Sequence, residues 1–220
     1  MKSLKDRRPH VLPCYLHGSL FATFTLLVIA MLCSQPARAA DDPAAVIRST
    51  VDQAFDVLRD QDLKKPERRK ERIAKLRVIA DRVFDWETMA QSSLGVAYRS
   101  ITDDQRKQFV TLFRDIIADD YKDDIDRFMG DERVLVQGAE NREDQRVVKT
   151  ILVTHSRERV PIDYFMQERS GRWQIVDFSV EGVSLVNHYR TSFANFLANH
   201  TFASLLERLK ARHPNQPGSP

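Results

Sequence analysis

Residues 147–180 read VVKTILVTHSRERVPIDYFMQERSGRWQIVDFSV, and this stretch decides the fold. It is rich in the β-branched and aromatic residues that favour strands, and short polar turns interrupt it at 156–158 and 169–171. A further β-rich segment, Val134–Val136, precedes it across the turn Asn141–Asp144. Short turns join antiparallel neighbours, because parallel strands need a long crossover. The sequence therefore predicts an antiparallel meander of about four strands.

Helical patterns flank this meander on both sides. Before it, apolar residues recur at helical spacing in the stretches 43–58, 73–83 and 102–128. The longest of these opens with a capping box, in which Thr102 is the N-cap and Gln105 follows three residues later. After the meander, helical spacing returns in His188–Leu197 and Phe202–Leu209. This order predicts an α+β fold, a curved antiparallel sheet packed with N- and C-terminal helices.

Residues 1–39 have the pattern of a cleaved secretory signal. A basic start is followed by the uncharged apolar run Leu20–Leu32 and by small residues at Ala37 and Ala39. The run is shorter than the roughly 20 residues that a membrane-spanning helix needs, which argues against an anchor. Leu32 is too bulky to precede a lipidated Cys33, which argues against a lipoprotein. We therefore predict cleavage after Ala39 and a periplasmic mature protein.

The predicted organisation is a signal peptide at 1–39, a single domain at 40–212 and a disordered tail at 213–220. Residues 1–39 hold five basic residues and one acidic residue, so their removal changes the formal charge from +3 to −1. They also hold both cysteines, so we expect the mature chain to have no disulfide and no cysteine metal site. A balanced charge argues against nucleic-acid binding, which needs a concentrated basic face.

Motifs of catalysis and cofactor binding are absent from the sequence. It contains no G-x-S-x-G, H-E-x-x-H, P-loop or G-x-G-x-x-G motif, and no two histidines of the mature chain stand four residues apart. One enzymatic alternative is an isomerase that uses Tyr164 and Asp177 in an apolar pocket. Asp177 alternates with Val176 and Phe178, however, which places its carboxyl group on the opposite face. We therefore predict no enzyme activity, no cofactor and no metal.

Two clusters of charged residues have the pattern of solvated faces. The basic cluster consists of Lys64, Lys65, Arg68, Arg69 and Lys70. The acidic cluster is interleaved with the apolar face of the longest helical pattern and consists of Asp115, Asp119, Asp120, Asp123, Asp124 and Asp126. These acids lack the central glycine and the closing glutamate of a calcium-binding loop. We interpret both clusters as solvent-exposed charge.

Large apolar side chains are the most prominent remaining feature. We single out ten on the longest helix, the strands and the last helices: Phe109, Leu112, Phe113, Ile116, Val160, Ile162, Tyr164, Met166, Phe178 and Phe193. A sheet that curves around helices either encloses a filled core or leaves an apolar cavity, and the sequence pattern is the same in both cases.

A resemblance to a known family favours the cavity. Its specific part resembles the MlaC family and consists of Trp173, Asp177, Glu181-Gly182-Val183-Ser184-Leu185, Tyr189-Arg190 and Phe193. The helical half is similar to that family at Phe84-Asp85, Leu94-Gly95, Tyr98, Thr102, Arg106 and Phe109 through Tyr121. The likeness covers roughly Val46 to Leu209. It departs from the family pattern at Asn187-His188, where an asparagine directly before Tyr189 is expected.

The resemblance implies a function as well as a fold. MlaC proteins, also called toluene-tolerance auxiliary proteins, are periplasmic phospholipid-binding components of an ABC lipid-transport system, with an NTF2-like cone and an apolar cavity. The chain is then expected to hold phospholipid acyl chains against the ten apolar residues. Its expected partners are an inner-membrane ABC transporter complex with an MCE-type subunit and an outer-membrane lipoprotein complex, which maintain outer-membrane lipid asymmetry. The alternatives are a periplasmic adaptor with a filled core and a carrier of hopanoid-type lipids.

Overall fold

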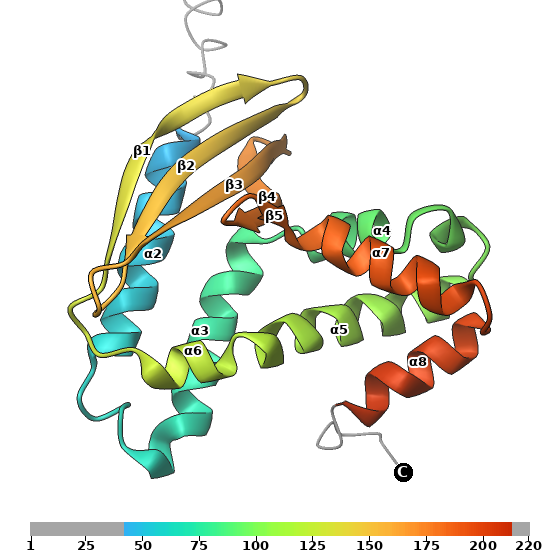
Figure 1. Cartoon of the computed structure of the whole chain (residues 1–220), viewed down its shortest axis with the longest axis horizontal. Coiled ribbons are helices and arrows are strands. Elements are labelled where there is room, and N and C mark those ends of the chain that lie inside the picture. The colour runs from blue at the N-terminus through green and yellow to red at the C-terminus, as the bar shows by residue number, and fades with distance from the viewer. Residues whose placement is uncertain (1–41, 213–220) are drawn as a thin grey trace, which may run out of the picture. The chain divides into compact units, whose positions relative to one another are not determined.

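Antiparallel strands form one five-stranded sheet in the order β1-β2-β3-β4-β5 (Figure 1). They are β1 (Arg133–Arg142), β2 (Gln145–Val153), β3 (Arg159–Arg169), β4 (Arg172–Val180) and β5 (Val183–Ser184). The computed structural model describes residues 42–212, so the predicted signal peptide, both cysteines and the predicted tail lie outside the described residues. The predicted meander is confirmed, and the two-residue β5 adds a fifth strand to the expected four.

Tight turns join the last three strands because their residues adopt left-handed backbone angles. Ser170 and Gly171 have φ angles of 50° and 75°, and Glu181 and Gly182 have φ angles of 53° and 82°. Two successive residues with positive φ are typical of a type I′ turn, whose twist matches that of the strands it joins. The β3–β4 hairpin is therefore closed tightly, and β4 turns back at once into β5.

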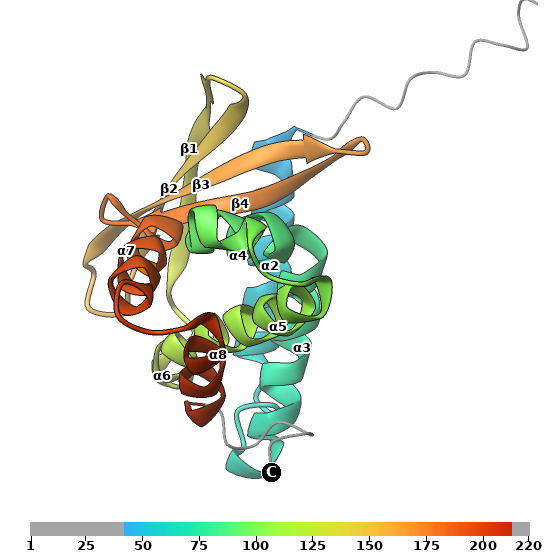
Figure 2. The same cartoon turned by 90° about the vertical axis from the view of Figure 1, so that its right-hand side faces the viewer.

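The register of the meander gives the sheet two faces. Tyr164 of β3 stands opposite Val148 of β2 and Phe178 of β4. Ile162 stands opposite Thr150 on the same face. Side chains that are paired across neighbouring strands point to the same side of a sheet. This is the inner face, because Val148 and Phe178 pack against helices and Figure 2 shows the helices beneath the sheet.

Helices precede and follow the sheet as predicted. Those before it are α2 (Pro43–Arg59), the 3-10 helix η1 (Pro66–Arg68), α3 (Arg69–Val83), α4 (Trp86–Leu94), the 3-10 helix η2 (Gly95–Arg99), α5 (Asp103–Asp120) and α6 (Lys122–Arg127). Those after it are α7 (Leu185–Leu197) and α8 (Phe202–Ala211). The predicted capping box of α5 is present, since Thr102 accepts a hydrogen bond from the Gln105 backbone and the Gln105 side chain accepts one from Thr102 N–H.

The structure differs from the prediction at Tyr121, which divides the expected helix 102–128 into α5 and α6. Tyr121 has φ −101° and ψ 2°, outside α-helical geometry. The residue before it, Asp120, is bound from two other helices. The Tyr189 phenol of α7 donates to its carboxylate, and Arg212 Nη2 at the end of α8 donates to Oδ1 at 2.8 Å. The junction of α5 and α6 thus coincides with the point where α7 and α8 are tied to them.

The interpretation of the acidic cluster as solvated is wrong for part of it. Asp115 is only 5% exposed and forms an ion pair with Arg77 of α3. Asp126 is exposed as interpreted, but it pairs with Arg69 Nη2 at 2.7 Å and with Arg72 Nη2 at 2.6 Å, both from α3. Periodicity along one helix separates its charged positions from its apolar positions, but it does not reveal a second helix that carries complementary arginines.

Buried apolar side chains form two separate clusters. The helical cluster joins α4, α5, α7 and α8 and includes Phe109, Phe113 and Phe193, none more than 5% exposed. The rings of Phe109 and Phe193 meet edge to face, with centroids 5.5 Å apart. The sheet cluster packs α2 against the sheet and includes Ile47 and Val148. Both clusters are filled cores, and they hold the helices on the inner face of the sheet.

Phe109→Ala is expected to lower the free energy of unfolding by about 3–5 kcal/mol, because truncation of a fully buried phenylalanine leaves a cavity. Urea-induced unfolding of the purified protein measures this change. Val96→Ala is the control, since Val96 is 88% exposed and its truncation is expected to cost less than about 0.5 kcal/mol. Equal effects of the two substitutions would contradict a filled helical cluster.

Candidate functional site

Part of the inner face belongs to neither cluster. Val134 of β1, Leu152 of β2, and Val160 and Ile162 of β3 are half-buried and lie outside both filled cores. Leu152 stands opposite Val134 on one side and Val160 on the other, so the strip is continuous across three strands. Apolar side chains that are half-buried over a continuous strip mark a surface that the protein's own core leaves uncovered.

Apolar residues of α2 and α6 lie next to this strip. Phe55 of α2 and Phe128 after α6 are half-buried, with ring centroids 5.2 Å apart. The start of β1 is fastened to the end of α2, because Arg59 Nε donates to Gly130 O and Arg59 Nη2 donates to Glu132 O, both at 3.0 Å. These contacts hold the end of α2, which carries Phe55, against the residues that lead into β1.

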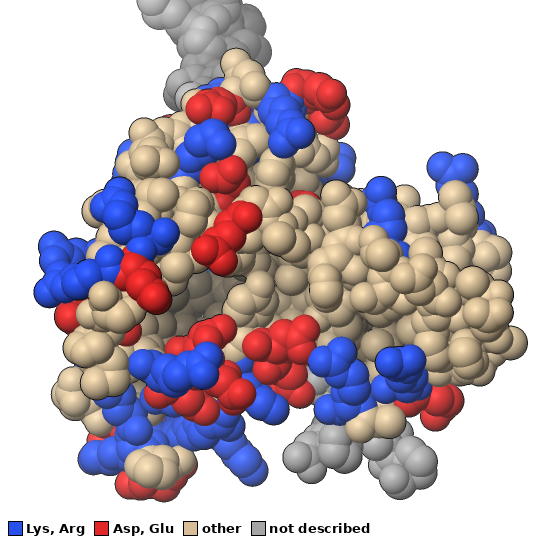
Figure 3. Space-filling model, viewed as in Figure 1, with Lys and Arg blue, Asp and Glu red and all other residues tan. Residues whose placement is uncertain are grey.

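Between β3 and α6 the surface is hollowed (Figure 3). Lys, Arg, Asp and Glu side chains surround this hollow, and uncharged residues occupy its interior in the view of Figure 3. The uncovered apolar strip crosses β1, β2 and β3, so it ends on the strand that borders the hollow. The arrangement is an apolar recess with a charged rim, which suits a ligand that has an apolar body and a polar end.

Two tyrosines stand beside Phe178 at the edge of the strip. The ring centroids of Tyr121 and Phe178 are 5.8 Å apart, and those of Tyr164 and Phe178 are 6.4 Å apart. Loss of hydration, with a smaller effect of the nearby Tyr121, raises the pKa of Tyr164 to about 12. Tyr164 is nevertheless half-buried rather than sealed in a core. A phenol that is poorly hydrated and yet partly accessible faces a recess.

The ten apolar residues predicted as the site fall into two groups. Six are packed into the filled cores, with exposure of 5% or less: Phe109, Leu112, Phe113, Ile116, Met166 and Phe193. Val160, Ile162 and Tyr164 are half-buried on the inner face, and Phe178 is 9% exposed between the tyrosines. The structure therefore places the last four on the inner face of β3 and β4, where Phe178 also belongs to the helical cluster, and packs the first six into the two cores.

Sequence reasoning missed several residues beside the hollow. The sequence predicts strands at Val134 and Leu152 and a helix that includes Tyr121 and Phe128, but the predicted site contains none of these residues. The signal for the strand residues was present in the alternation of apolar positions. The inclusion of Phe55 required the contact with Phe128, which no local pattern reveals.

Asp177 does not reach the hollow. It pairs with Phe165 in the register, on the face opposite Tyr164. Its carboxylate accepts hydrogen bonds from Ser184 Oγ at 2.5 Å and from Val186 N–H at 3.0 Å, where it supports the start of α7. Burial raises the pKa of Asp177, and these hydrogen bonds oppose that shift. The structure therefore separates the two groups that an isomerase would have to combine.

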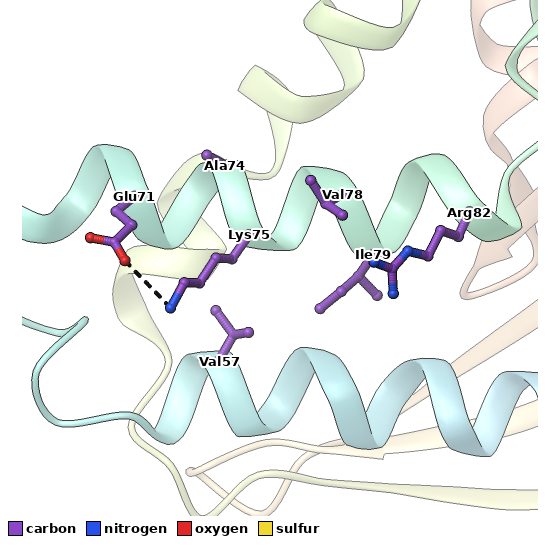
Figure 4. Close-up of a pocket in the computed structure, with 7 residues that line it drawn as sticks. All are labelled: Val57, Glu71, Ala74, Lys75, Val78, Ile79 and Arg82. Atoms are coloured by element: carbon purple, nitrogen blue, oxygen red, sulfur yellow. Dashed lines mark ion pairs between the residues drawn. The ribbon is translucent and has the colours of Figure 1, made fainter.

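A groove of about 370 Å³ lies between α2 and α3 (Figure 4). Val57 lies on the α2 side and Val78 and Ile79 lie on the α3 side, and an ion pair of 3.4 Å joins Lys75 to Glu71. A further recess of about 350 Å³ is lined by polar residues at the β3–β4 turn, among them Gln167 and Arg169. Neither recess shares a residue with the uncovered strip.

Residues 42–212 contain no group of three or more His, Cys, Asp or Glu side chains arranged to hold a metal ion. Within the same part of the chain, no helix combines the length and the hydropathy that a membrane crossing requires.

A curved antiparallel sheet with helices on its inner face and a surface hollow between β3 and α6 defines the α+β class of this protein. The chain belongs to the MlaC family: the family model described as MlaC protein matches residues 48–211. The resemblance seen in the sequence is thereby confirmed. No curated protein matches the sequence.

A solved structure supports the fold. The chain is similar to the phospholipid-binding protein from Ralstonia solanacearum, which was solved in complex with a phospholipid. The TM-score is 0.68 at 19% identity, and the alignment covers 78% of this chain and 96% of that chain. The α+β fold with a curved antiparallel sheet is confirmed, with five strands in place of about four.

Tyr164→Phe is expected to change the free energy of unfolding by less than about 0.5 kcal/mol, because no hydrogen bond to the Tyr164 phenol is found within residues 42–212. Tyr189→Phe is the matched comparison, since it removes a hydrogen bond to the Asp120 carboxylate and is expected to cost about 1–3 kcal/mol. Urea denaturation at neutral pH measures both. A large loss for Tyr164→Phe would show that this phenol has a structural partner.

Proposed function

We propose that this chain is a periplasmic carrier that holds phospholipid acyl chains in the hollow between the sheet and α6. The observation that carries the proposal is the continuous strip of Val134, Leu152, Val160 and Ile162, which neither filled core covers. Membership of the MlaC family and the likeness to a phospholipid-binding protein support it. The proposed action is binding and transfer, with no catalytic step.

The proposed route runs between two membranes. In this route an inner-membrane ABC transporter complex with an MCE-type subunit and an outer-membrane lipoprotein complex exchange lipid with the carrier. A signal peptide at 1–39 would deliver the chain to the periplasm, where the domain 40–212 acts. Both membrane complexes and the signal peptide are parts of the proposal.

Energetics fit a carrier. Two 16-carbon chains at about 0.8 kcal/mol per buried CH₂ give roughly 25 kcal/mol relative to water. This exceeds the practical ceiling of about 18–21 kcal/mol for non-covalent binding, so the gross figure overstates the affinity. Release into water is nevertheless slow. Transfer between a bilayer and the hollow is nearly balanced, because the chains are buried in both places, so the direction has to come from the partner complexes.

The lining of the hollow divides the ten predicted residues by role. Val160, Ile162, Tyr164 and Phe178 are proposed to contact the acyl chains directly, because they share the inner face of the sheet and the first three are only half-buried. The remaining six are proposed to support that lining from the filled cores, or to meet the chains only after the clusters rearrange. Val134, Leu152 and Phe55 are added to the direct lining.

The mature protein, purified gently, is expected to carry about one lipid, because release into water is slow on the energetic argument above. Native mass spectrometry followed by lipid analysis measures the occupancy and the class of lipid. Recovery of empty protein that takes up no lipid from liposomes would contradict the carrier and favour an adaptor with a filled core. Recovery of a hopanoid-type lipid in place of phospholipid would support the carrier function and change the proposed ligand.

Ile162→Trp is expected to lower lipid occupancy while the fold persists, because added bulk enters space meant for an acyl chain. If the inner face were filled at Ile162, the same change would overpack it and cost about 1–3 kcal/mol. Lipid occupancy and the melting temperature of delipidated protein measure the two outcomes.

Leu135→Trp is the matched control for that substitution. Leu135 follows Val134 on the opposite face of β1 and is 44% exposed, so extra bulk there meets solvent. Asp163→Ala is a weaker control, because Asp163 pairs with Lys149 Nζ at 3.2 Å. A folded Ile162→Trp protein with the lipid load of Leu135→Trp would contradict the placement of β3 along the pocket.

A further inference from the structure

Tyr121 and Tyr164 bring two phenol groups close to Phe178, which stands opposite Tyr164 on the inner face of the sheet. They come from the α5–α6 junction and from β3, and both rings pack near Phe178, at 5.8 Å and 6.4 Å between centroids. Both residues are half-buried. Within residues 42–212 neither phenol oxygen takes part in a hydrogen bond, whereas the Tyr189 phenol donates to Asp120.

Hydroxyl groups in an apolar setting are normally paired with a partner, so these two require one. Water supplies it while the hollow is empty of lipid. An acyl chain that displaces this water offers no hydrogen-bond acceptor in return. Binding of a lipid would therefore leave both tyrosine hydroxyl groups without a hydrogen-bond partner unless the lipid supplies acceptors of its own.

The position of Tyr121 indicates which part of a lipid meets these groups. Tyr121 directly follows Asp120 in the chain, and the nearby Asp120 and Asp124 carboxylates raise its pKa after the larger effect of burial. Tyrosine favours boundaries where one end of the ring is apolar and the other is wet. When acyl chains fill the apolar interior, the ester linkages that join them to glycerol lie at this boundary.

We propose that Tyr121 and Tyr164 donate hydrogen bonds to the ester carbonyl oxygens of a two-chain glycerolipid. The hollow then distinguishes ester-linked lipids from ether-linked or purely hydrocarbon lipids of equal length, which lack carbonyl acceptors. This assignment rests on the proposed function as a lipid carrier, and it makes the two tyrosines determinants of lipid class at the same site.

The experiment is a competition between two lipids that differ only in the linkage. Delipidated mature protein is incubated with vesicles that hold equal amounts of a diacyl phosphatidylethanolamine and its dialkyl ether analogue with the same chain lengths. Native mass spectrometry resolves the two complexes. The wild-type protein is expected to favour the diacyl lipid by about two- to tenfold for each hydrogen bond made.

The variant Tyr121→Phe/Tyr164→Phe is expected to lose this preference while it still loads the ether lipid as the wild type does. Each single variant is expected to retain part of the preference, and the melting temperature of each variant reports its folding. Tyr98→Phe is the matched control, because Tyr98 is buried in the helical cluster. The Tyr98→Phe protein is expected to prefer the diacyl lipid as strongly as the wild-type protein does.

Two results overturn the assignment alone: equal loading of both lipids by the wild-type protein, or an unchanged preference in the double variant. If the double variant is unfolded, the folded single variants decide, and an undiminished preference in both overturns the assignment. Failure of the wild-type protein to load either lipid overturns the proposed function, and the assignment falls with it.

Discussion

Ion pairs between α3 and the α5–α6 segment fix one wall of the hollow. Arg77 pairs with Asp115, Arg69 and Arg72 pair with Asp126, and Arg114 Nη1 lies 3.5 Å from Asp81 Oδ2. Long charged side chains that meet at their ends can join helices whose backbones stand apart, whereas interlocked apolar side chains require close packing. Because charge rather than apolar packing makes this joint, α6 can border a space instead of filling it.

These pairs specify an arrangement more than they stabilise it. Burial lowers the pKa of Arg77, and among the described residues the Nε atoms of Arg77 and Arg114 are buried without a hydrogen-bond partner. Desolvation therefore offsets much of the attraction. The removal of one partner would still be costly, since it would leave an unpaired buried charge. At Asp126 the hydrogen bond from Arg69 lowers the carboxyl pKa, but the pair is exposed and contributes little to stability.

How far the sequence predicts the structure depends on the range of each interaction. The meander and the cap of α5 are predicted because alternation, turn residues and Thr102 act within a few positions. The break at Tyr121 is not predicted, since Tyr189 and Arg212, which bind the adjacent Asp120, are remote in sequence. For the same reason the pairing of Asp115 is missed.

The candidate site shows the same limit. Periodicity predicts equally well that Phe113 lies on the apolar face of a helix and Ile162 on the apolar face of a strand. It does not show whether another element covers either face. The structure makes the difference: Phe113 is fully buried against α7, and Ile162 is half-buried beside the hollow. Whether another element covers an apolar face on this side of the sheet depends on the position of α6. Ion pairs with arginines of α3 help to fix that position.

The two filled cores stabilise the fold, whereas the hollow is the proposed binding site for the lipid. The helical and sheet clusters bury their side chains against one another, and a lipid that binds the folded chain adds stability through mass action. Acyl chains are apolar in a bilayer and apolar in the hollow, so the hydrophobic part of the transfer largely cancels for any lipid of a given length. The polar part of the transfer free energy does not cancel. It arises at the polar boundary, where phenols and charged side chains exchange hydrogen bonds with water for hydrogen bonds with the lipid's oxygen atoms. Discrimination among lipids of equal length therefore has to arise at that boundary, whereas the apolar interior sets only how much chain the hollow can hold.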